Sequence, residues 1–405
     1  MVAQGGKAAG FHVLIIGAGS VGLLLAQRLK VLDIPCTVYE REVHLNARGR
    51  NWNFGIYWAQ APLAECLPQP VQDAISKAQV KPHAKIDEGA TMPILNAETG
   101  EVLMRAPTPN VLRLNRARLR EVLAQAIDVK YGKRLKSVEK GDDGKGVIAT
   151  FEDGTTASGN LLVGADGAKS RVRQALLGAE RGGLQTLPLM GLRALGTLPA
   201  KIALELKNRI NADLVVTVHP VGLVAFIAVH DIPDENRPET WVWLFHLTYP
   251  YDANRESLTD AIEIRKIWDD FSHKLASPLQ DAFLSAAERS TLLTDRLGDW
   301  PTVTWDNWGG SVTLAGDAAH PMTYHRGQGL NNAVHDAAYL GRALNSVCYE
   351  DKPLEEAIDV YEKEVVERGY AAVVSSTENS MMMVDWEKLK QSPLFKYGLK
   401  QGSRA

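Results

Sequence analysis

The sequence predicts an α/β fold in which a parallel sheet is interleaved with a second, mostly antiparallel sheet and is followed by C-terminal helices. Three observations indicate this fold. Short apolar runs rich in branched residues lead into glycine-bearing turns, as buried parallel strands do. A long stretch between two of these runs alternates residue by residue, which is typical of strands with two different faces. The C-terminal part has the charged pattern of helices.

The composition is that of an ordinary globular protein. Of its 405 residues, 45% are hydrophobic and 23% are charged, and the formal net charge is −3. Without a basic stripe, nucleic acid is not an expected partner, and no apolar run is long enough for a membrane span. Three scattered cysteines, Cys36, Cys66 and Cys348, form neither a disulfide framework nor a metal cluster. We therefore expect a cytoplasmic protein without a metal site.

The first element is a buried strand over residues 13–16 that leads into a glycine-rich turn. Gly17, Gly19 and Gly22 lie in this turn, and residues 23–32 continue in a helical pattern. In such an arrangement the first glycine permits a tight turn and the second lets a pyrophosphate approach the backbone. The third lets helix and strand pack closely, and the helix N-terminus offers N–H groups to the phosphates.

The next strand, residues 36–39, ends in Glu40 and Arg41. Glu40 follows the glycines at the spacing of an acid that binds a ribose, and Arg41 beside it is a further candidate contact. Strand, glycines, helix, strand and acid in this order predict a bound dinucleotide. They leave NAD and FAD open.

Two further strand-like runs, residues 161–163 and 312–314, each precede a turn that contains glycine and aspartate. The second turn is followed by a loop that opens a long helix near Leu330. A simple NAD dehydrogenase has no need of these extra turns, so they favour FAD. The candidate contacts in them are Asp166, Gly316, Asp317, Pro321, Gly327, Gly329, Leu330 and Asn331.

These motifs, in this order, resemble the group A flavoprotein monooxygenases, the p-hydroxybenzoate hydroxylase-like family, from about residue 11 to residue 350. The resemblance implies a Rossmann-like FAD-binding domain whose first motif holds the ADP half of FAD. Asp166 would lie near the pyrophosphate, in a motif linked to both FAD and NAD(P)H. Asp317 would bind the ribityl chain, and the helix near Leu330 would direct its positive end at the flavin N1–C2=O region.

Two arginines extend the resemblance. Arg116 begins a segment similar to the Arg-x-x-Leu of the family, and Arg50 lies in a loop similar to the arginine-bearing loop after the ribose acid. Both are expected to reach the flavin. The resemblance also divides the chain into an FAD-binding domain (11–80, 106–182 and 292–350), a substrate-binding β-sheet domain (81–105 and 183–291) and a C-terminal helical segment (351–405).

The substrate would lie against the antiparallel sheet. Trp241, Trp243 and Phe245 alternate along one strand and so share one face. An aromatic face suits a planar apolar substrate, although packing of the same residues against helices is equally consistent with the pattern. Tyr324, in the loop after Asp317, is a further candidate for substrate contact.

The resemblance implies a single-component monooxygenase. NADPH or NADH, docking transiently, would reduce FAD, O2 would add as a C4a-hydroperoxide, and one oxygen would hydroxylate or epoxidise an aromatic, polycyclic or other electron-rich small molecule. A phenol hydroxylase also profits from a group that removes the phenolic proton. The candidates are Arg193, His219, His246 and His325, and the sequence does not distinguish among them.

Other activities share this cofactor. An oxidase or reductase, a Baeyer–Villiger enzyme, and a non-redox protein that uses FAD as a scaffold for binding or cyclisation are the alternatives. A halogenase would carry W-x-W-x-I-P, but Trp241-x-Trp243 is followed here by Phe245 and His246. Residues 52–58 (WNFGIYW) and 329–332 (GLNN) are similar to fungal members of the family from secondary metabolism.

Overall fold

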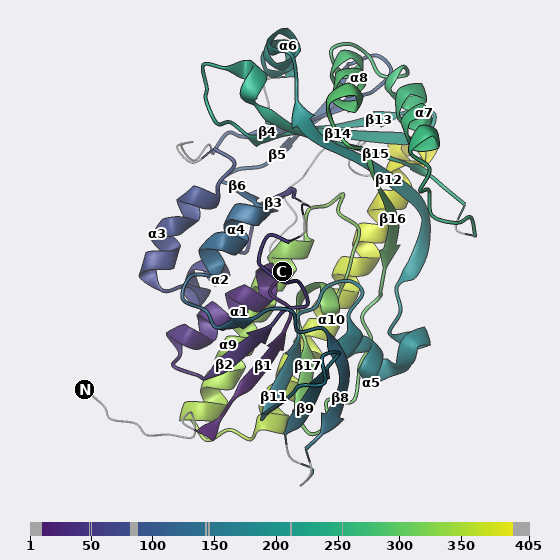
Figure 1. The fold of residues 1–405 in the computed structure, drawn as a ribbon. Coiled ribbons are helices and arrows are strands. Elements are labelled where there is room, and N and C mark those ends of the chain that lie inside the picture. Colours follow the sequence, from purple (N-terminus) through teal and green to yellow (C-terminus); the bar gives the residue numbers. More distant parts are fainter. Residues whose placement is uncertain are drawn as a thin grey trace. The chain divides into compact units, whose positions relative to one another are not determined.

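The computed structural model describes residues 10–47, 49, 51–81, 88–141, 144, 146–210, 213–252 and 254–391 (Figure 1). Contacts between Cα atoms divide the chain into two compact units. Unit 1 comprises residues 1–79, 112–185 and 298–377, and unit 2 comprises residues 80–111, 186–297 and 378–405. Each unit is thus assembled from three separate parts of the chain.

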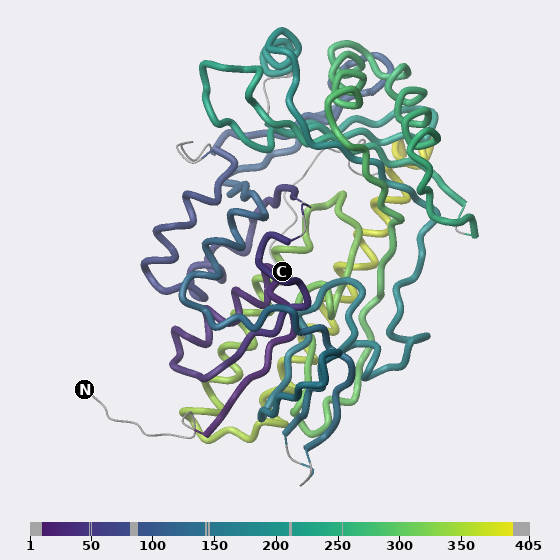
Figure 2. Tube along the Cα trace, viewed as in Figure 1, coloured from purple at the N-terminus to yellow at the C-terminus, as the bar shows by residue number. Residues whose placement is uncertain are grey.

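Unit 1 is built around a five-stranded parallel sheet with the strand order β17–β11–β1–β2–β7. Purple, teal and green parts of the chain therefore lie side by side in this sheet (Figure 2). β1 and β11 are buried along their whole length, as strands covered on both faces must be. The strands are β1 (Val13–Ile16), β2 (Cys36–Tyr39), β7 (Val129–Lys130), β11 (Leu161–Gly164) and β17 (Val312–Leu314).

Helices and a small second sheet cover this parallel sheet. Helix α1 (Ser20–Val31) packs against α9 (Gly329–Tyr349) and against α4 (Arg116–Leu123). The second sheet is antiparallel, and Phe151 on it stacks against Tyr39 of β2 with 4.8 Å between the ring centroids. Its strands are β8 (Leu135–Lys140), β9 (Val147–Phe151) and β10 (Thr156–Gly159).

The remaining elements of unit 1 are a two-stranded sheet and further helices. β3 (Asn53–Ile56) pairs antiparallel with β6 (Leu112–Asn115), and α4 begins directly after β6. The helices are α2 (Gln60–Cys66), α3 (Gln69–Ala78), α5 (Arg171–Arg181), the short η3 (Gly316–Ala318) and most of α10 (Leu354–Met383).

Unit 2 contains a seven-stranded sheet with the order β16–β12–β15–β14–β13–β4–β5. β12, β15, β14 and β13 pair antiparallel, as do β4 and β5, whereas β13 and β4 run parallel. The strands are β4 (Thr91–Asn96), β5 (Val102–Pro107), β12 (Gln185–Thr197), β13 (Leu214–His219), β14 (Leu223–Asp231), β15 (Val242–Pro250) and β16 (Leu293–Asp299). The mostly antiparallel sheet agrees with the predicted fold class.

Helices cover both faces of this sheet to different extents. On one face, the core includes residues of α6 (Ala200–Ile210), α7 (Ala261–Ser272) and α8 (Leu279–Arg289). On the other face, Leu389 of α11 (Trp386–Gln391) packs with Val216, Val218 and Val224, and Met382 and Met383 join this cluster. A short η2 (Pro238–Thr240) precedes β15.

The unit limits differ from the expected domain limits at several places. Residue 80 and residues 106–111 and 292–297 lie in unit 2, and residues 183–185 lie in unit 1. The expected C-terminal segment is divided: the part from residue 378 on lies in unit 2, and residues 351–377 lie in unit 1. The reason for the last difference is packing. Tyr361 of α10 is fully buried, and its hydroxyl donates to the carbonyl of Leu314 in β17 at 2.9 Å.

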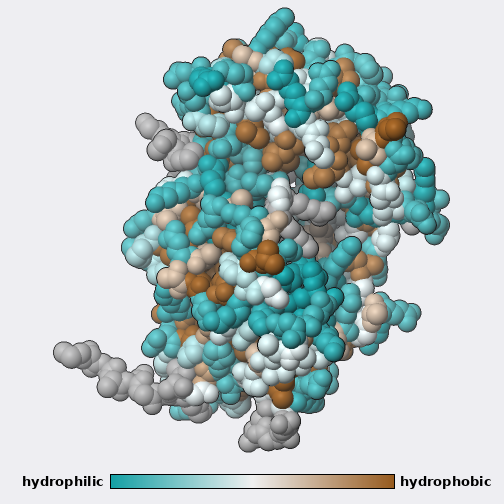
Figure 3. Space-filling view, viewed as in Figure 1, coloured by the Kyte–Doolittle hydropathy of each residue, from teal (hydrophilic) through white to brown (hydrophobic). Residues whose placement is uncertain are grey.

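Most of the visible surface in Figure 3 is hydrophilic, and hydrophobic residues form small separate patches on it. Among the described residues, no helix combines the length and the apolarity needed to cross a bilayer.

Candidate active site

The turn between β1 and α1 has a shape that requires glycine. Gly17 has a φ of 111°, and a Cβ atom there would lie 2.5 Å from the carbonyl oxygen of Ala165. A Cβ atom at Gly22 would lie 2.0 Å from the carbonyl oxygen of Gly17, so α1 begins directly against its own turn. At Gly19 the nearest atom to such a Cβ would be 3.9 Å away. The middle of the turn is therefore open to a ligand.

Buried charged side chains hold this turn from behind. The N–H of Ala18 donates to Glu40 Oε2 at 2.8 Å, and the carbonyl of Ala18 accepts from Arg120 Nε at 3.1 Å. Glu40 Oε1 accepts from the N–H of Glu42 at 2.9 Å. Each carboxylate oxygen keeps a second lone pair, so Glu40 can still accept from a ribose hydroxyl. Arg41 is more exposed and lies 3.5 Å from Glu42 Oε1.

Helices α1 and α9 begin at glycine-bearing turns. Like α2 and α3, they have no capping side chain and no acidic residue in the first turn. By contrast, Asn115, Ser170 and Asp260 cap α4, α5 and α7. The first-turn N–H groups of α1 and α9 thus have no partner within their own helices and carry the positive end of the helix dipole. Such groups suit a pyrophosphate or an electron-rich ring edge.

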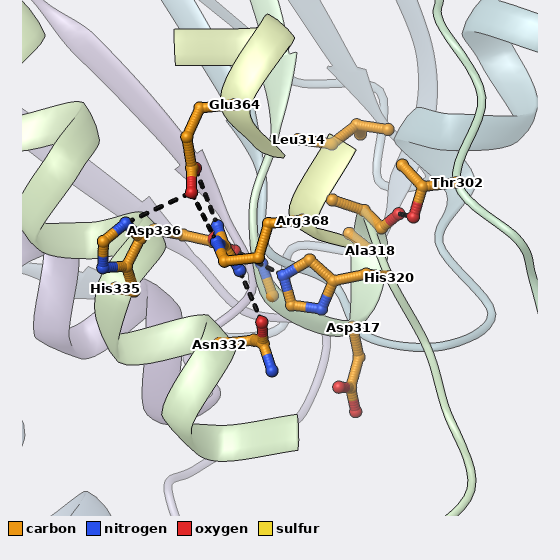
Figure 4. A network of polar contacts seen from close by, with 12 residues as sticks. Thr302, Leu314, Asp317, Ala318, His320, Asn332, His335, Asp336, Glu364 and Arg368 are labelled. Atoms are coloured by element: carbon orange, nitrogen blue, oxygen red, sulfur yellow. Dashed lines mark hydrogen bonds and ion pairs between the residues drawn. The ribbon is translucent and has the colours of Figure 1, made fainter. Parts of the chain in front are cut away.

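The turn after β17 presents one carboxylate. Gly316 has a φ of 61°, and a Cβ atom there would lie 2.8 Å from Val21 Cγ1 of α1. The side chain of Asp317 is exposed and points away from the polar contacts beneath the turn (Figure 4). A Cβ atom at Gly329 would lie 3.8 Å from Asp317 Oδ1, so this carboxylate stands beside the start of α9.

The turn after β11 is fixed by its own helix and by a buried arginine. Asp166 Oδ2 accepts from the N–H of Arg171 at 2.7 Å. Arg173, fully buried, donates to the carbonyls of Ala168 at 2.6 Å and Ala318 at 2.8 Å, and so joins the turns after β11 and β17. Burial lowers the pKa of Arg173 to about 10.

Arg120 and Arg173 were not among the residues expected from the sequence. Arg120 could have been found because it lies on the apolar face of α4, between Leu119 and Val122, where a charge needs a buried partner. No signal in the sequence distinguishes Arg173 from its neighbour Arg171.

Two expected cofactor contacts, Gly327 and Asn331, form hydrogen bonds with other groups of the protein. The N–H of Gly327 donates to the carbonyl of Tyr324 at 2.9 Å. The side chain of Asn331 accepts from the N–H of Tyr57 at 2.8 Å and donates to the carbonyl of Gly55 at 2.9 Å. The side chain of Asn331 thus attaches α9 to β3 and the residue after it, and the Gly327 N–H closes a turn in its own loop.

Other predicted contacts are placed as follows. Leu330 and Pro321 are buried, and the carbonyl of Pro321 accepts from the N–H of Trp300 at 3.2 Å. The guanidinium of Arg116 lies 4.5 Å from the ring centroid of Trp52. Arg50 lies outside the described residues.

In the loop after Pro321, the exposed Tyr324 lies against His325, with 4.5 Å between the ring centroids. Burial lowers the pKa of His325 to about 4, so its imidazole is neutral at physiological pH. Neutral His325 can accept a proton only weakly.

The aromatic face of β15 is core, which corrects the prediction of a substrate pocket there. Trp241, Trp243 and Phe245 are at most 3% exposed and belong to the core shared with α6, α7 and α8. The ring of Phe245 lies 5.1 Å from that of Phe283 in α8. Burial of apolar area under these helices explains the alternation.

The opposite face of the sheet carries a row of polar and aromatic side chains. Arg193 of β12 pairs in register with His246 of β15, and His246 pairs with Phe226 of β14. Arg193 Nη2 lies 2.9 Å from Asp295 Oδ2 of β16, and the rings of Phe226 and His246 are 5.6 Å apart. We call Asp295, Arg193, His246 and Phe226 the β12–β15 row.

His219 does not belong to this row. It is buried at the end of β13, and its Nδ1 accepts from the N–H of Val221 in the following turn at 3.1 Å. Desolvation lowers the pKa of His219, which keeps it neutral. Of the four acid–base candidates, the fold therefore brings together only Arg193 and His246.

Together, the fold and the turns define a dinucleotide-binding enzyme of the flavoprotein class. The open turn at Gly19, the uncapped starts of α1 and α9 and the exposed carboxylate of Asp317 are groups of the kind that suit phosphates, sugar hydroxyls and an electron-rich ring.

The chain belongs to the family of FAD-dependent monooxygenases, and FAD is its cofactor. A family profile described as FAD binding domain matches residues 71–376. The FAD-dependent monooxygenase cctM of Talaromyces islandicus is 40% identical over 97% of this chain and 98% of its own. The FAD-dependent monooxygenase phnB of Penicillium herquei is 34% identical over 96% and 94%, respectively. These relatives confirm the resemblance to fungal members of the family.

The same fold occurs in a solved bacterial structure. HpxO of Klebsiella pneumoniae, complexed with FAD and uric acid, is 20% identical, with a TM-score of 0.74 over 95% of this chain and 92% of that chain.

Proposed function

We propose that the protein is a single-component monooxygenase that takes two electrons from NADPH or NADH and adds one atom of O2 to an aromatic or other electron-rich small molecule of secondary metabolism. The balanced reaction converts substrate–H, O2, NAD(P)H and a proton into substrate–OH, NAD(P)⁺ and water. The observation that carries the proposal is similarity to an FAD-dependent monooxygenase over 97% of the chain.

Different residues of unit 1 would bind different parts of FAD. The turn at Gly19 and the start of α1 would receive the pyrophosphate, and Glu40 the ribose. Asp317 would accept from the ribityl hydroxyls, and the first turn of α9 would face the ring edge that gains negative charge on reduction. When bound, FAD supplies the electron transfer and the activation of O2.

The β12–β15 row would select the substrate. Arg193 provides a positive charge that favours an ionised phenol or a similar acidic ring, and His246 beside it can accept a proton. Phe226 adds an apolar ring at the end of the row. The uric acid bound by HpxO is likewise planar and acidic, which supports this class of substrate.

The substrate role of Arg193 has a direct test. We expect Arg193→Met to lower kcat/KM for the aromatic substrate about 100-fold while flavin binding is kept, since a proton-transfer or charge-stabilising group contributes on that scale. Arg209→Met, which removes an exposed arginine from α6, is the matched control. Equal kcat/KM values for the two variants would remove Arg193 from the site.

The activity itself is tested by following NADPH and NADH oxidation against a panel of phenols and indoles under ¹⁸O₂. Substrate-stimulated oxidation with one labelled oxygen in a hydroxylated product supports the proposal. Hydrogen peroxide as the only oxygen product would indicate an oxidase, and an ester or lactone would indicate Baeyer–Villiger chemistry. A bound flavin that no nicotinamide reduces would indicate a non-redox role.

A further inference from the structure

A buried polar network lies directly beneath the turn that presents Asp317 (Figure 4). At its centre is Asp336 of α9, which is fully buried. Asp336 Oδ2 accepts from the N–H of Gly316 at 2.6 Å and lies 2.7 Å from His320 Nε2. Asp336 Oδ1 accepts from Arg368 Nη2 at 2.5 Å. The Asp336 carboxylate thus binds the backbone of the Gly316–Asp317 turn and is itself bound by Arg368 of α10.

Arg368 extends the network to the start of α9. Its Nη1 donates to Asn332 Oδ1 at 2.7 Å, and its Nε donates to Glu364 Oε1 at 2.7 Å. Asn332 is in the first turn of α9, where its Nδ2 donates to the carbonyl of Gln328 at 3.0 Å. A single guanidinium group therefore fixes both the Gly316–Asp317 turn, through Asp336, and the beginning of α9, through Asn332.

The central pair is ionised. Desolvation opposes the charge of Asp336, but His320 and Arg368 hold the pKa of this carboxyl well below its usual range. Desolvation likewise opposes the charge of Arg368, and Asp336 and Glu364 raise the pKa of Arg368 above its usual value. Removal of one partner would leave a buried charge uncompensated.

Close packing of α10 supports the same segment. A Cβ atom at Gly369 would lie 2.9 Å from Thr302 Oγ1 and 3.1 Å from His320 Cβ, so α10 approaches more closely than a larger residue would allow. Thr302 Oγ1 donates to the carbonyl of Ala319 at 2.9 Å. The backbone from Gly316 to His320 is therefore bound on its inner side, while Asp317 faces outward.

We propose that Arg368 and Asp336 are positioning residues that set the distance between the Asp317 carboxylate and the first turn of α9, and thereby set the affinity for FAD and its reduction potential. The inference rests on the proposed assignment of Asp317 and α9 to the flavin. Neither side chain touches the cofactor in this scheme. They act because donors and acceptors stabilise a ligand only when they are held in the bound geometry.

The test uses three variants and a control. Asn332→Ala removes the link between Arg368 and α9 without unpairing a buried charge. Arg368→Met removes the whole connection, and the double variant Arg368→Met/Asp336→Asn removes it together with the negative charge. Arg342→Met is the control, because it deletes another arginine–carboxylate pair of α9, with Glu65, that is exposed on the surface. The FAD dissociation constant of the apoprotein, the flavin reduction potential and the apoprotein unfolding midpoint are measured for each.

We expect Asn332→Ala to weaken FAD binding about tenfold and to change the reduction potential, as the loss of a hydrogen bond to a charged group would. Arg368→Met should weaken FAD binding further, and the double variant should bind FAD more tightly than Arg368→Met because it buries no unpaired charge. Arg342→Met should leave the affinity and the potential unchanged.

A purely structural network would lower the unfolding midpoint of the variants and leave FAD affinity and potential at the control values. That result would overturn the proposal. If Arg368→Met does not fold, Asn332→Ala and the double variant still decide between the two outcomes. The measurements need neither substrate nor NAD(P)H, so they are independent of oxygen transfer. A protein that binds FAD as expected but oxygenates nothing would refute the proposed function alone.

Discussion

Carboxylates of unit 1 differ in what surrounds their oxygens. Both oxygens of Glu40 accept from backbone N–H groups, and Asp336 is buried between Gly316, His320 and Arg368. Asp317 instead is exposed, and its side chain points away from the network of Asp336, His320 and Arg368 (Figure 4). Glu40 and Asp336 therefore stabilise the turns, whereas Asp317 is the exposed carboxylate that the turn after β17 presents. All three side chains are carboxylates, so their surroundings determine whether they stabilise a turn or face solvent.

Asp317→Ala should weaken FAD binding by about tenfold or more, because a hydrogen bond to a charged group contributes roughly 1.5–3 kcal/mol. The dissociation constant is measured by titrating apoprotein with FAD. Asp73→Ala on the exposed side of α3 serves as the control. Full retention of flavin by Asp317→Ala on dilution would contradict the role assigned to this carboxylate.

Glu362 of α10 makes the stability depend on pH. Burial raises the pKa of its carboxyl from 4.5 to about 7, although Trp305 Nε1 and Asn307 Nδ2 donate to it at 2.8 and 3.0 Å. A raised carboxyl pKa means that the folded state holds the proton more tightly. The stabilising contribution is therefore complete below about pH 4.5 and is lost as the pH rises to about 7.

We expect the unfolding free energy of the wild type to fall, relative to Glu362→Gln, by roughly 1 kcal/mol per pH unit between pH 5 and 7. Urea unfolding of both proteins at pH 5, 6, 7 and 8 gives the difference, from which other titrating groups cancel. A difference that stays constant with pH would show that Glu362 titrates normally. The absolute stability of the variant does not affect this comparison.

Whole elements are specialised by how they begin. α1 and α9 start at glycine-bearing turns without side-chain caps, whereas α4, α5 and α7 are capped by polar side chains. A cap stabilises a helix by satisfying its first N–H groups, so a helix that must bind a ligand there has to do without one. We expect the cofactor to take the place of a cap at α1 and α9.

In the turn at the start of α1, we expect one glycine to matter for stability and another to matter for FAD binding. Gly22→Ala should destabilise the apoprotein by about 1–3 kcal/mol or more, because its Cβ would collide with the carbonyl oxygen of Gly17 at 2.0 Å. Gly19→Ala should leave apoprotein stability within about 0.5 kcal/mol of wild type but weaken FAD binding, because its methyl group would enter the open space of the turn. Unfolding curves and FAD titrations check both. Equal effects of the two substitutions on binding and stability would be inconsistent with this division.

At the scale of the whole molecule, the cofactor motifs come from distant parts of the chain. β1, β11 and β17 are neighbours in one sheet, and Arg173 joins the turns that follow β11 and β17. FAD, by contacting turns on all three strands, would link these parts further. Binding to the folded state alone then stabilises unit 1 by mass action.

FAD at about 100 times its dissociation constant should stabilise the protein by about 2.7 kcal/mol. Hydrogen exchange of apoprotein and holoprotein, followed by mass spectrometry, should show the added protection in the turns before α1, η3 and α9. The central strands of the sheet in unit 2, β14 and β15, provide the internal reference because most of their residues are buried. Protection confined to unit 2 would contradict the placement of the cofactor site in unit 1.

The sequence by itself determined the elements and the cofactor. Runs such as residues 13–16, the three glycines that follow and the Gly316–Asp317 turn are local patterns. β1 and β17 form at the predicted residues, and α1 begins at Ser20, three residues before the predicted start. These patterns are reliable because each depends on the backbone geometry of a few consecutive residues.

Only the tertiary structure decided which face and which partner each side chain has. Alternation along β15 placed Trp243 and Phe245 on one face, but only the helices packed there showed that this face is core and that His246 and Arg193 lie on the other. Arg368 bonds to Asn332 and Asp336, which lie more than 30 residues from it in the chain. The physical reason is that burial and pairing depend on long-range packing, which no local pattern records.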